Sequence, residues 1–154
     1  MTVEELQARE SIRDTLARYN HSGDRGRISE LAACFTADGV LDLGQDDAAH
    51  GREAIEARLS QVVWSTTAQS EKPRVRHHVS SIQIEIEDPE HARVRSYFLV
   101  FTGIGLDHWG IYEDRFRAVS DTWLIEHRHV QVDGVSSPES MASEFFKNNS
   151  RTSQ

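Results

Sequence analysis

Cysteine is almost missing from this chain, since Cys34 is the only one among its 154 residues. A single cysteine excludes an internal disulfide. Cys34 lies in the apolar stretch LAACF, which predicts a small buried residue rather than a catalytic thiol. The length is that of one domain, with about two thirds of its unfolded surface buried on folding.

Long apolar runs and an excess of basic residues are missing as well. No stretch approaches the roughly 18 apolar residues of a membrane span, and the start, MTVEELQARE, is acidic and polar, unlike a signal peptide. Acidic residues number 25 against 17 basic ones, which gives a net charge of −8 and argues against a nucleic-acid partner. We therefore expect a soluble, cytoplasmic protein with no membrane or nucleic-acid partner.

Signature motifs for nucleotide and flavin cofactors are also absent. The chain has no G-x-G-x-x-G after a strand, no P-loop and no G-x-S-x-G elbow. Eight histidines are present, and two of them, His127 and His129 in EHRHV, share one face of a predicted strand at a spacing that can bind zinc. No third ligand follows at a close spacing, so we expect neither a metal site nor a cofactor.

Helical spacing of apolar residues dominates the first part of the chain. It predicts helices over residues 4–21, 27–35 and 51–63. Between the last two, the pair Asp38 and Gly39 is typical of a turn. The letters VLDL after this pair indicate a short strand.

The rest of the chain has the alternation of β-strands. Strands are expected over residues 75–87, 92–103, 108–119 and 122–132. The last two are joined by a tight hairpin around Ser120 and Asp121. Helices followed by an antiparallel meander predict one α+β domain over residues 1–134, with the helices on one face of a curved sheet. Residues 135–154 are expected to form a partly mobile tail, whose Phe145–Phe146 pair can dock on the body or on a partner.

Two adjacent histidines enter the first of these strands, in RVRHHVSSIQIEIE. Neighbours in an extended chain point to opposite faces, so only one of His77 and His78 shares the side of the isoleucines that follow. Simple alternation from Ile82 places His78 on that apolar face. A β-bulge near Val79–Ser80 would reverse the parity and place His77 there instead.

Four stretches of the chain together resemble the SnoaL-like branch of the nuclear-transport-factor-2-like superfamily. They cover roughly residues 5–133 and read LARYNHSGDRGRISELAACFTADGVLDL, HGREAIEARL, RVRHHVSSIQIEI and HWGIYEDRFRAVSDTWLIEHRHVQVD. The resemblance implies a cone-shaped α+β barrel, in which three N-terminal helices pack on a strongly curved, mostly antiparallel sheet and enclose a deep pocket. The branch includes polyketide cyclases, steroid isomerases, dehydratases, a dehydrochlorinase and non-catalytic proteins, so the fold alone does not define a function.

The resemblance also implies a catalytic dyad. In the dehydratase and dehydrochlorinase members, a histidine at the start of the long strand abstracts a proton and an aspartate after the first helix orients it. Asp24 matches that aspartate, and His77 or His78 matches the histidine, with the family strand favouring His77. Tyr19 matches a tyrosine that assists catalysis in the bile-acid dehydratase branch. A histidine suits this task because its pKa near 6.5 lets it take and return a proton, while a carboxylate fixes its tautomer.

A plainer interpretation of the same residues stays open. An aspartate after a glycine often caps the next helix, and two histidines at the start of a strand are compatible with a polar surface.

Further pocket residues are expected on the strands. Tyr112, in WGIYEDRF, is a candidate second hydroxyl, and Phe98 lies near the place where scytalone dehydratase has its second histidine. Asp42 lies near the position of the aspartate base of the steroid isomerases, although its spacing does not match cleanly. His127 is a further candidate for the lining of the pocket.

Alternation also sorts the charged residues of the strand over residues 108–119. Tyr112, Asp114 and Phe116 share one of its faces. We expect Asp114 to form a structural ion pair with Arg128 of the neighbouring strand rather than to act in catalysis.

Two classes of function follow from these observations. One is a cofactor-independent lyase or isomerase, of the dehydratase or cyclase type, that acts through Asp24 and a histidine on a small hydrophobic, polycyclic molecule. The other is a non-catalytic ligand-binding or dimerisation module. In either class we expect a homo-oligomer, a dimer through the outer face of the sheet, because apolar residues gather there. These residues are Leu99, Phe101, Trp109 and Ile111.

Overall fold

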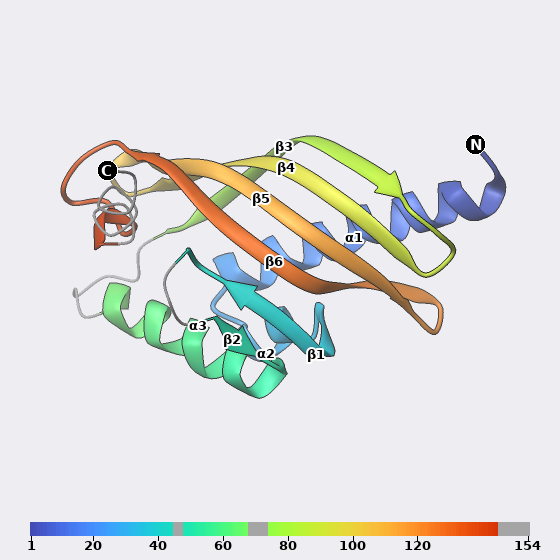
Figure 1. Cartoon of the computed structure of the whole chain (residues 1–154). Coiled ribbons are helices and arrows are strands. Elements are labelled where there is room, and N and C mark those ends of the chain that lie inside the picture. The colour runs from blue at the N-terminus through green and yellow to red at the C-terminus, as the bar shows by residue number, and fades with distance from the viewer. Residues whose placement is uncertain (45–47, 68–73, 145–154) are drawn as a thin grey trace, which may run out of the picture.

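One long helix runs along one face of a single curved sheet (Figure 1). A computed structural model of the chain describes residues 1–44, 48–67 and 74–144. The helices are α1 (Val3–Asp24), α2 (Ile28–Ala32) and α3 (Arg52–Thr67). The strands are β1 (Phe35–Asp42), β2 (Ala49–His50), β3 (Arg76–Ile86), β4 (His91–Thr102), β5 (Gly105–Val119) and β6 (Thr122–Val135).

The predicted α+β class is confirmed, since the helices come first and the four long strands follow as an antiparallel meander. The hairpin at Ser120 is also confirmed, with a positive φ of 54° at that residue. Residues 136–144 pack on the domain, where Ser140 and Ala142 are buried. The Phe145–Phe146 pair and the end of the tail lie outside the described residues. No helix within the described ranges is long and apolar enough to cross a membrane.

Helix α1 starts at a capping box and ends at a glycine turn. The Thr2 side chain accepts a hydrogen bond from the Glu5 backbone, and the Glu5 carboxylate accepts one from the Thr2 backbone, at 3.2 and 3.0 Å. On the buried side of the helix, Ile12 is fully inaccessible to solvent. Gly26, with a φ of +68°, then turns the chain towards α2. The helix therefore ends at Asp24, which lies where the helices meet the sheet.

The sheet has the order β2-β1-β6-β5-β4-β3 and is antiparallel at every pair except one. Strand β1 pairs with β6 in parallel, and β2 extends this edge by two residues. The short strand expected after the second helix is therefore present, whereas its parallel pairing and the strand β2 were not predicted. This pairing joins segments more than 80 residues apart, so no local pattern announces it.

The turn expected at Asp38 and Gly39 is wrong, because both residues lie inside β1. The register between β1 and β6 shifts between Phe35 and Val40. A Cβ at Gly39 would lie 3.0 Å from the Cβ of Phe35 and 3.1 Å from the Ile125 carbonyl oxygen. Glycine is thus needed here because the irregular strand leaves no room for a side chain, and not because the chain reverses direction.

A buried ion pair joins β5 and β6 below helix α1. The Arg128 side chain donates two hydrogen bonds to the Asp114 carboxylate, at 2.8 and 2.7 Å, and both side chains are fully buried. The rings of Tyr19 and Tyr112 each lie over the guanidinium, with ring centroids 4.1 Å from its carbon. The ion pair that strand alternation predicts is therefore present, and it is clamped between a tyrosine from the helix and one from the sheet.

Removing the charge of Asp114 is expected to destabilise the fold strongly. Asp114→Asn keeps the shape but leaves the Arg128 guanidinium buried without a counter-ion, which costs about 3–5 kcal/mol in the free energy of unfolding. Urea unfolding measures this change. The control is Arg27→Ala, which removes an exposed pair with Glu30 and is expected to cost less than about 1 kcal/mol. A loss below about 1 kcal/mol for Asp114→Asn would mean that the pair is not structural.

The outer face of the sheet is partly apolar. Tyr97, Leu99 and Phe101 alternate along β4 and are 52%, 40% and 38% exposed, and Trp109 and Ile111 lie opposite Leu99 and Tyr97 on β5. A row of large exposed apolar side chains in the middle of a sheet is typical of a partner surface. We propose that two copies of the chain pair through this face.

Sedimentation velocity at micromolar concentration tests the dimer. The wild type is expected to sediment at twice the chain mass of 17.5 kDa, and Leu99→Glu is expected to shift it to the monomer because the new charge would be buried. Val119→Glu, at the exposed end of the β5–β6 hairpin, should leave the dimer intact. A wild type that sediments only as a monomer would exclude this assembly.

Candidate active site

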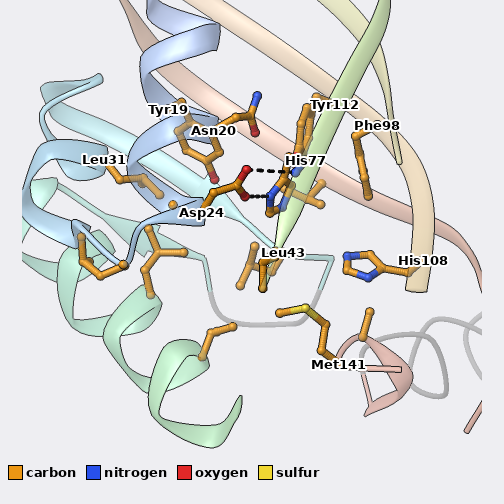
Figure 2. A pocket seen from close by; sticks show the side chains of 18 of the residues that line it. Tyr19, Asn20, Asp24, Leu31, Leu43, His77, Phe98, His108, Tyr112 and Met141 are labelled. Carbon is orange, nitrogen blue, oxygen red and sulfur yellow. Dashed lines mark hydrogen bonds and ion pairs between the residues drawn. The ribbon is translucent and has the colours of Figure 1, made fainter. Parts of the chain in front are cut away.

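A cavity of about 390 Å³ lies between the helices and the sheet (Figure 2). Most of its walls are apolar. They include Leu31, Leu43, Leu59, Val75, Val132 and Met141. A small set of polar groups converges inside these walls, which is the usual composition of a site for a small organic molecule.

Asp24 and His77 meet in this cavity. The His77 Nδ1 atom lies 2.6 Å from Asp24 Oδ1, and the His77 backbone N–H donates to Asp24 Oδ2 at 3.1 Å (Figure 2). The two side chains are only 22% and 10% exposed. The carboxylate thus holds the ring through Nδ1–H, so that Nε2 is the nitrogen that can take a proton from a ligand.

The neighbouring histidine, His78, points away from the cavity. Its ring packs edge-on against Phe101 on the outer face, at a centroid distance of 5.2 Å. The alternation that places His78 inward is therefore wrong, and the reason is a bulge. The register between β3 and β4 shifts between Ser80 and Gln83, and Ser81 has a φ of 51°. One extra residue there reverses the parity of the strand.

The two predicted tyrosines line the cavity beside this pair. Burial raises the pKa of Tyr19 and of Tyr112, so both phenols keep their protons and act as hydrogen-bond donors. Phe98 also lines the cavity and stacks on Tyr112, with ring centroids 4.5 Å apart. The structure therefore brings Tyr19, Phe98 and Tyr112 together with Asp24 and His77.

Two other predicted pocket residues, Asp42 and His127, are absent from its lining, so their assignment to the pocket is wrong. In β6 the inward residue is Arg128, so His127 and His129 point to the outer face. In β1 the buried residue is Leu41, and Asp42 instead accepts a hydrogen bond from His129 Nδ1 at 2.9 Å. Asp42 and His127 thus lie on the side of the sheet opposite the cavity.

A second histidine, His108, lines the cavity and was not predicted. Its Nδ1 atom lies 2.7 Å from Asp107 Oδ1, and its ring packs edge-on against Phe98 at 5.9 Å. Burial lowers the pKa of His108, and electrostatic repulsion from the His77 imidazole lowers it further, against the opposite effect of Asp107. Strand alternation could have predicted this position, because His108 lies two residues before Gly110 on the face of β5 that carries Tyr112.

No group of three or more histidine, cysteine, aspartate or glutamate side chains in the described part of the chain is arranged to hold a metal ion. The polar side chains of the cavity include two imidazoles, two phenols and the Asp24 carboxylate, together with the Asn20 amide and the Arg25 guanidinium. This set is suited to moving a proton and to donating or accepting hydrogen bonds.

Comparison with known proteins places this architecture in a family. Residues 4–129 match the family described as the SnoaL-like domain. The search of curated proteins found no significant match.

Several solved structures share the fold. A proposed scytalone dehydratase from Novosphingobium aromaticivorans is 23% identical, with a TM-score of 0.77 over 88% of this chain and 91% of its own. An NTF2-like protein with a cystatin-like fold from the same organism is 24% identical, with a TM-score of 0.73 over 88% and 89%. A protein from Catenulispora acidiphila in complex with S-DNPA is 26% identical, with a TM-score of 0.68 over 80% and 92%.

Nuclear magnetic resonance titration of the histidines tests the description of this site. His108 is expected to titrate below the ordinary value of about 6.5, since burial disfavours its charged form. His77→Gln should raise the pKa of His108, because it removes the imidazole whose protonated form disfavours a proton on His108. His91→Gln, at the start of β4, should leave it unchanged. A His108 pKa at or above 6.5 would contradict the arrangement.

The same shift predicts a pH dependence of stability. The unfolded chain binds a proton at His108 more tightly than the folded chain does. The contribution of neutral His108 to the free energy of unfolding is therefore full above about pH 6.5, and it is lost as the pH falls through the folded-state pKa. The wild type is therefore expected to lose more stability between pH 7 and 5 than His108→Gln, as measured by urea unfolding.

Proposed function

This chain belongs to the SnoaL-like domain family, and we propose that it is a cofactor-independent lyase or isomerase, of the dehydratase or cyclase type, in which His77 abstracts a proton from carbon. The observation that carries this proposal is the hydrogen bond of 2.6 Å between Asp24 and His77 in a mostly apolar cavity. A neutral imidazole whose Nδ1 is held by a carboxylate exposes a basic Nε2, and the carboxylate stabilises the imidazolium that forms.

The reaction begins at a carbon next to a carbonyl group. Nε2 of His77 takes the proton from that carbon, and the electron pair of the broken C–H bond moves onto the carbonyl oxygen to form an enolate. The phenols of Tyr19 and Tyr112 line the same cavity and keep their protons. A phenol that donates to the developing oxyanion lowers the barrier to this step.

The enolate then reacts in one of two ways. In a lyase, its electrons form a double bond and expel a hydroxide from the neighbouring carbon, and the proton on His77 completes the leaving water. In an isomerase, His77 returns the proton to a different carbon. Both outcomes leave His77 neutral, as it began, so no external oxidant or reductant is needed.

The cavity favours a small, largely apolar ligand with more than one ring. Its volume of about 390 Å³ lies within the usual range for such sites, and its walls are mainly leucine, valine and methionine side chains. The name of the Novosphingobium neighbour points to dehydration, and the Catenulispora neighbour was solved with the ligand S-DNPA. The first name supports dehydration as the class of reaction, and the second makes S-DNPA a first compound for binding screens.

Hydrogen–deuterium exchange at the acidic carbon of 2-tetralone tests the base without knowledge of the natural substrate. The wild type in D₂O is expected to exchange this position about 10²- to 10⁴-fold faster than His77→Gln. Asp24→Asn should also be slower, because the imidazolium loses its counter-charge. Proton resonance spectra follow the loss of the signal with time.

His78→Ala is the matched control, because it removes the neighbouring imidazole, which lies on the outer face. This variant is expected to keep the wild-type exchange rate. If 2-tetralone binds but exchanges no faster with wild type than with His77→Gln, the proposal is wrong. The cavity would then be better explained by the second candidate, a non-catalytic module that binds a small ligand.

A further inference from the structure

The second histidine of the cavity has a carboxylate partner of its own. His108 and His77 come from different strands, and both rings extend into the cavity (Figure 2). Each holds an aspartate through Nδ1, at 2.7 Å for His108 and 2.6 Å for His77. The proton transfers described above use only His77, so the position of His108 calls for a separate role.

Asp107 is a buried carboxylate that accepts several hydrogen bonds. It accepts from Thr102 Oγ1 at 2.9 Å, from Ser140 Oγ at 2.6 Å and from the Met141 backbone at 3.1 Å. Burial alone would raise the pKa of Asp107, but the hydrogen bonds from Ser140, His108 and Thr102 outweigh it and hold this pKa below its ordinary value. An ionised carboxylate can only accept hydrogen bonds, so the His108 Nδ1 atom carries the proton.

The state of the other ring nitrogen follows from this tautomer. Burial disfavours a proton on His108, and a protonated His77 would disfavour it further. When His77 takes a proton in the reaction, its positive charge makes protonation of His108 still less favourable. His108 Nε2 therefore keeps its lone pair, and no hydrogen bond to it is found among the described residues.

We propose that His108 is a specificity-determining residue that accepts a hydrogen bond from a hydroxyl group of the ligand, with Asp107 as its positioning residue. The ligand class is then a hydroxylated carbonyl compound, such as a phenol or enol with an adjacent ring ketone. One part of it meets His77 and the tyrosines, and its hydroxyl meets His108. This inference rests on the proposed function only in placing the reacting ligand in the same cavity.

The surroundings of His108 favour recognition over a purely structural role. Its ring is held on one side by Asp107 and packs edge-on against Phe98, so the acceptor has a fixed direction. Asp107 also holds Ser140 and Met141 of the C-terminal segment, and Met141 forms part of the cavity wall. A fixed acceptor inside a mostly apolar cavity penalises any ligand that lacks the matching donor.

Paired probes measure this preference directly. The compounds are 2-naphthol, which carries a hydroxyl donor, and 2-methoxynaphthalene, which lacks one, with dissociation constants from fluorescence titration. Wild type is expected to bind 2-naphthol about tenfold more tightly, the typical effect of one good hydrogen bond. His108→Phe keeps a ring against Phe98 but has no acceptor, so the ratio should fall to about one, and His108→Gln should restore part of it.

Two control variants separate His108 from the other imidazoles. His91→Phe removes a histidine that also pairs with an aspartate, Asp88, but does so at the start of β4 and outside the cavity. This variant should keep the tenfold ratio. His77→Phe should keep the ratio as well. If His77→Phe abolishes the preference and His108→Phe does not, the hydroxyl is bound by His77 and the proposal is overturned.

Nitrogen resonances of the wild-type protein give a second readout that needs no variant. The His108 Nε2 signal is expected at the position of an unprotonated nitrogen and should move when 2-naphthol is added, but not with 2-methoxynaphthalene. Equal binding of the two probes, the absence of binding included, or an unmoved signal would overturn the proposal. Exchange of 2-tetralone that depends on His77 would still stand in that case, so the two proposals fail independently.

Discussion

The position of the site depends on the Arg128 guanidinium buried between two tyrosine rings. Arg128 extends from β6, pairs with Asp114 of β5, and stacks between Tyr112 of β5 and Tyr19 of α1. Such a cation is stable inside a protein only with its counter-ion and its hydrogen bonds in place, so the helix and the sheet can approach each other in few ways. Asp24 follows Tyr19 by five residues on the same helix, and this constraint places its carboxylate beside β3.

The walls of the cavity depend on one close approach of backbone and ring. A Cβ at Gly110 would lie 1.9 Å from the Gln131 carbonyl oxygen and 2.8 Å from the Phe98 ring. Glycine at this point of β5 therefore lets Phe98 lie flat against Tyr112 and lets β6 pass close by. Phe98 in turn supports the ring of His108, so a residue without a side chain helps to position one of the polar groups.

Much of this architecture could be predicted from the sequence, because helical and strand periodicity are local properties. The face of the sheet to which His77 points could not be predicted from alternation alone, because it depends on the bulge at Ser81. Asp42 was misplaced because its spacing did not show that Leu41 is the inward residue of β1. His127 was misplaced although alternation with the inward Arg128 places it on the outer face. His108 was overlooked although it continues the inward series of β5.

The two adjacent histidines also bear on how this site can change over time. Without the extra residue at Ser81, the parity of β3 before the bulge would reverse, and His78 would take the inward position that His77 now holds. An imidazole would face α1 in either frame of the strand. Because the two histidines are adjacent, one of them points into the cavity whichever way the residues of β3 before the bulge face. The loss or gain of one residue there therefore need not remove an imidazole from the cavity.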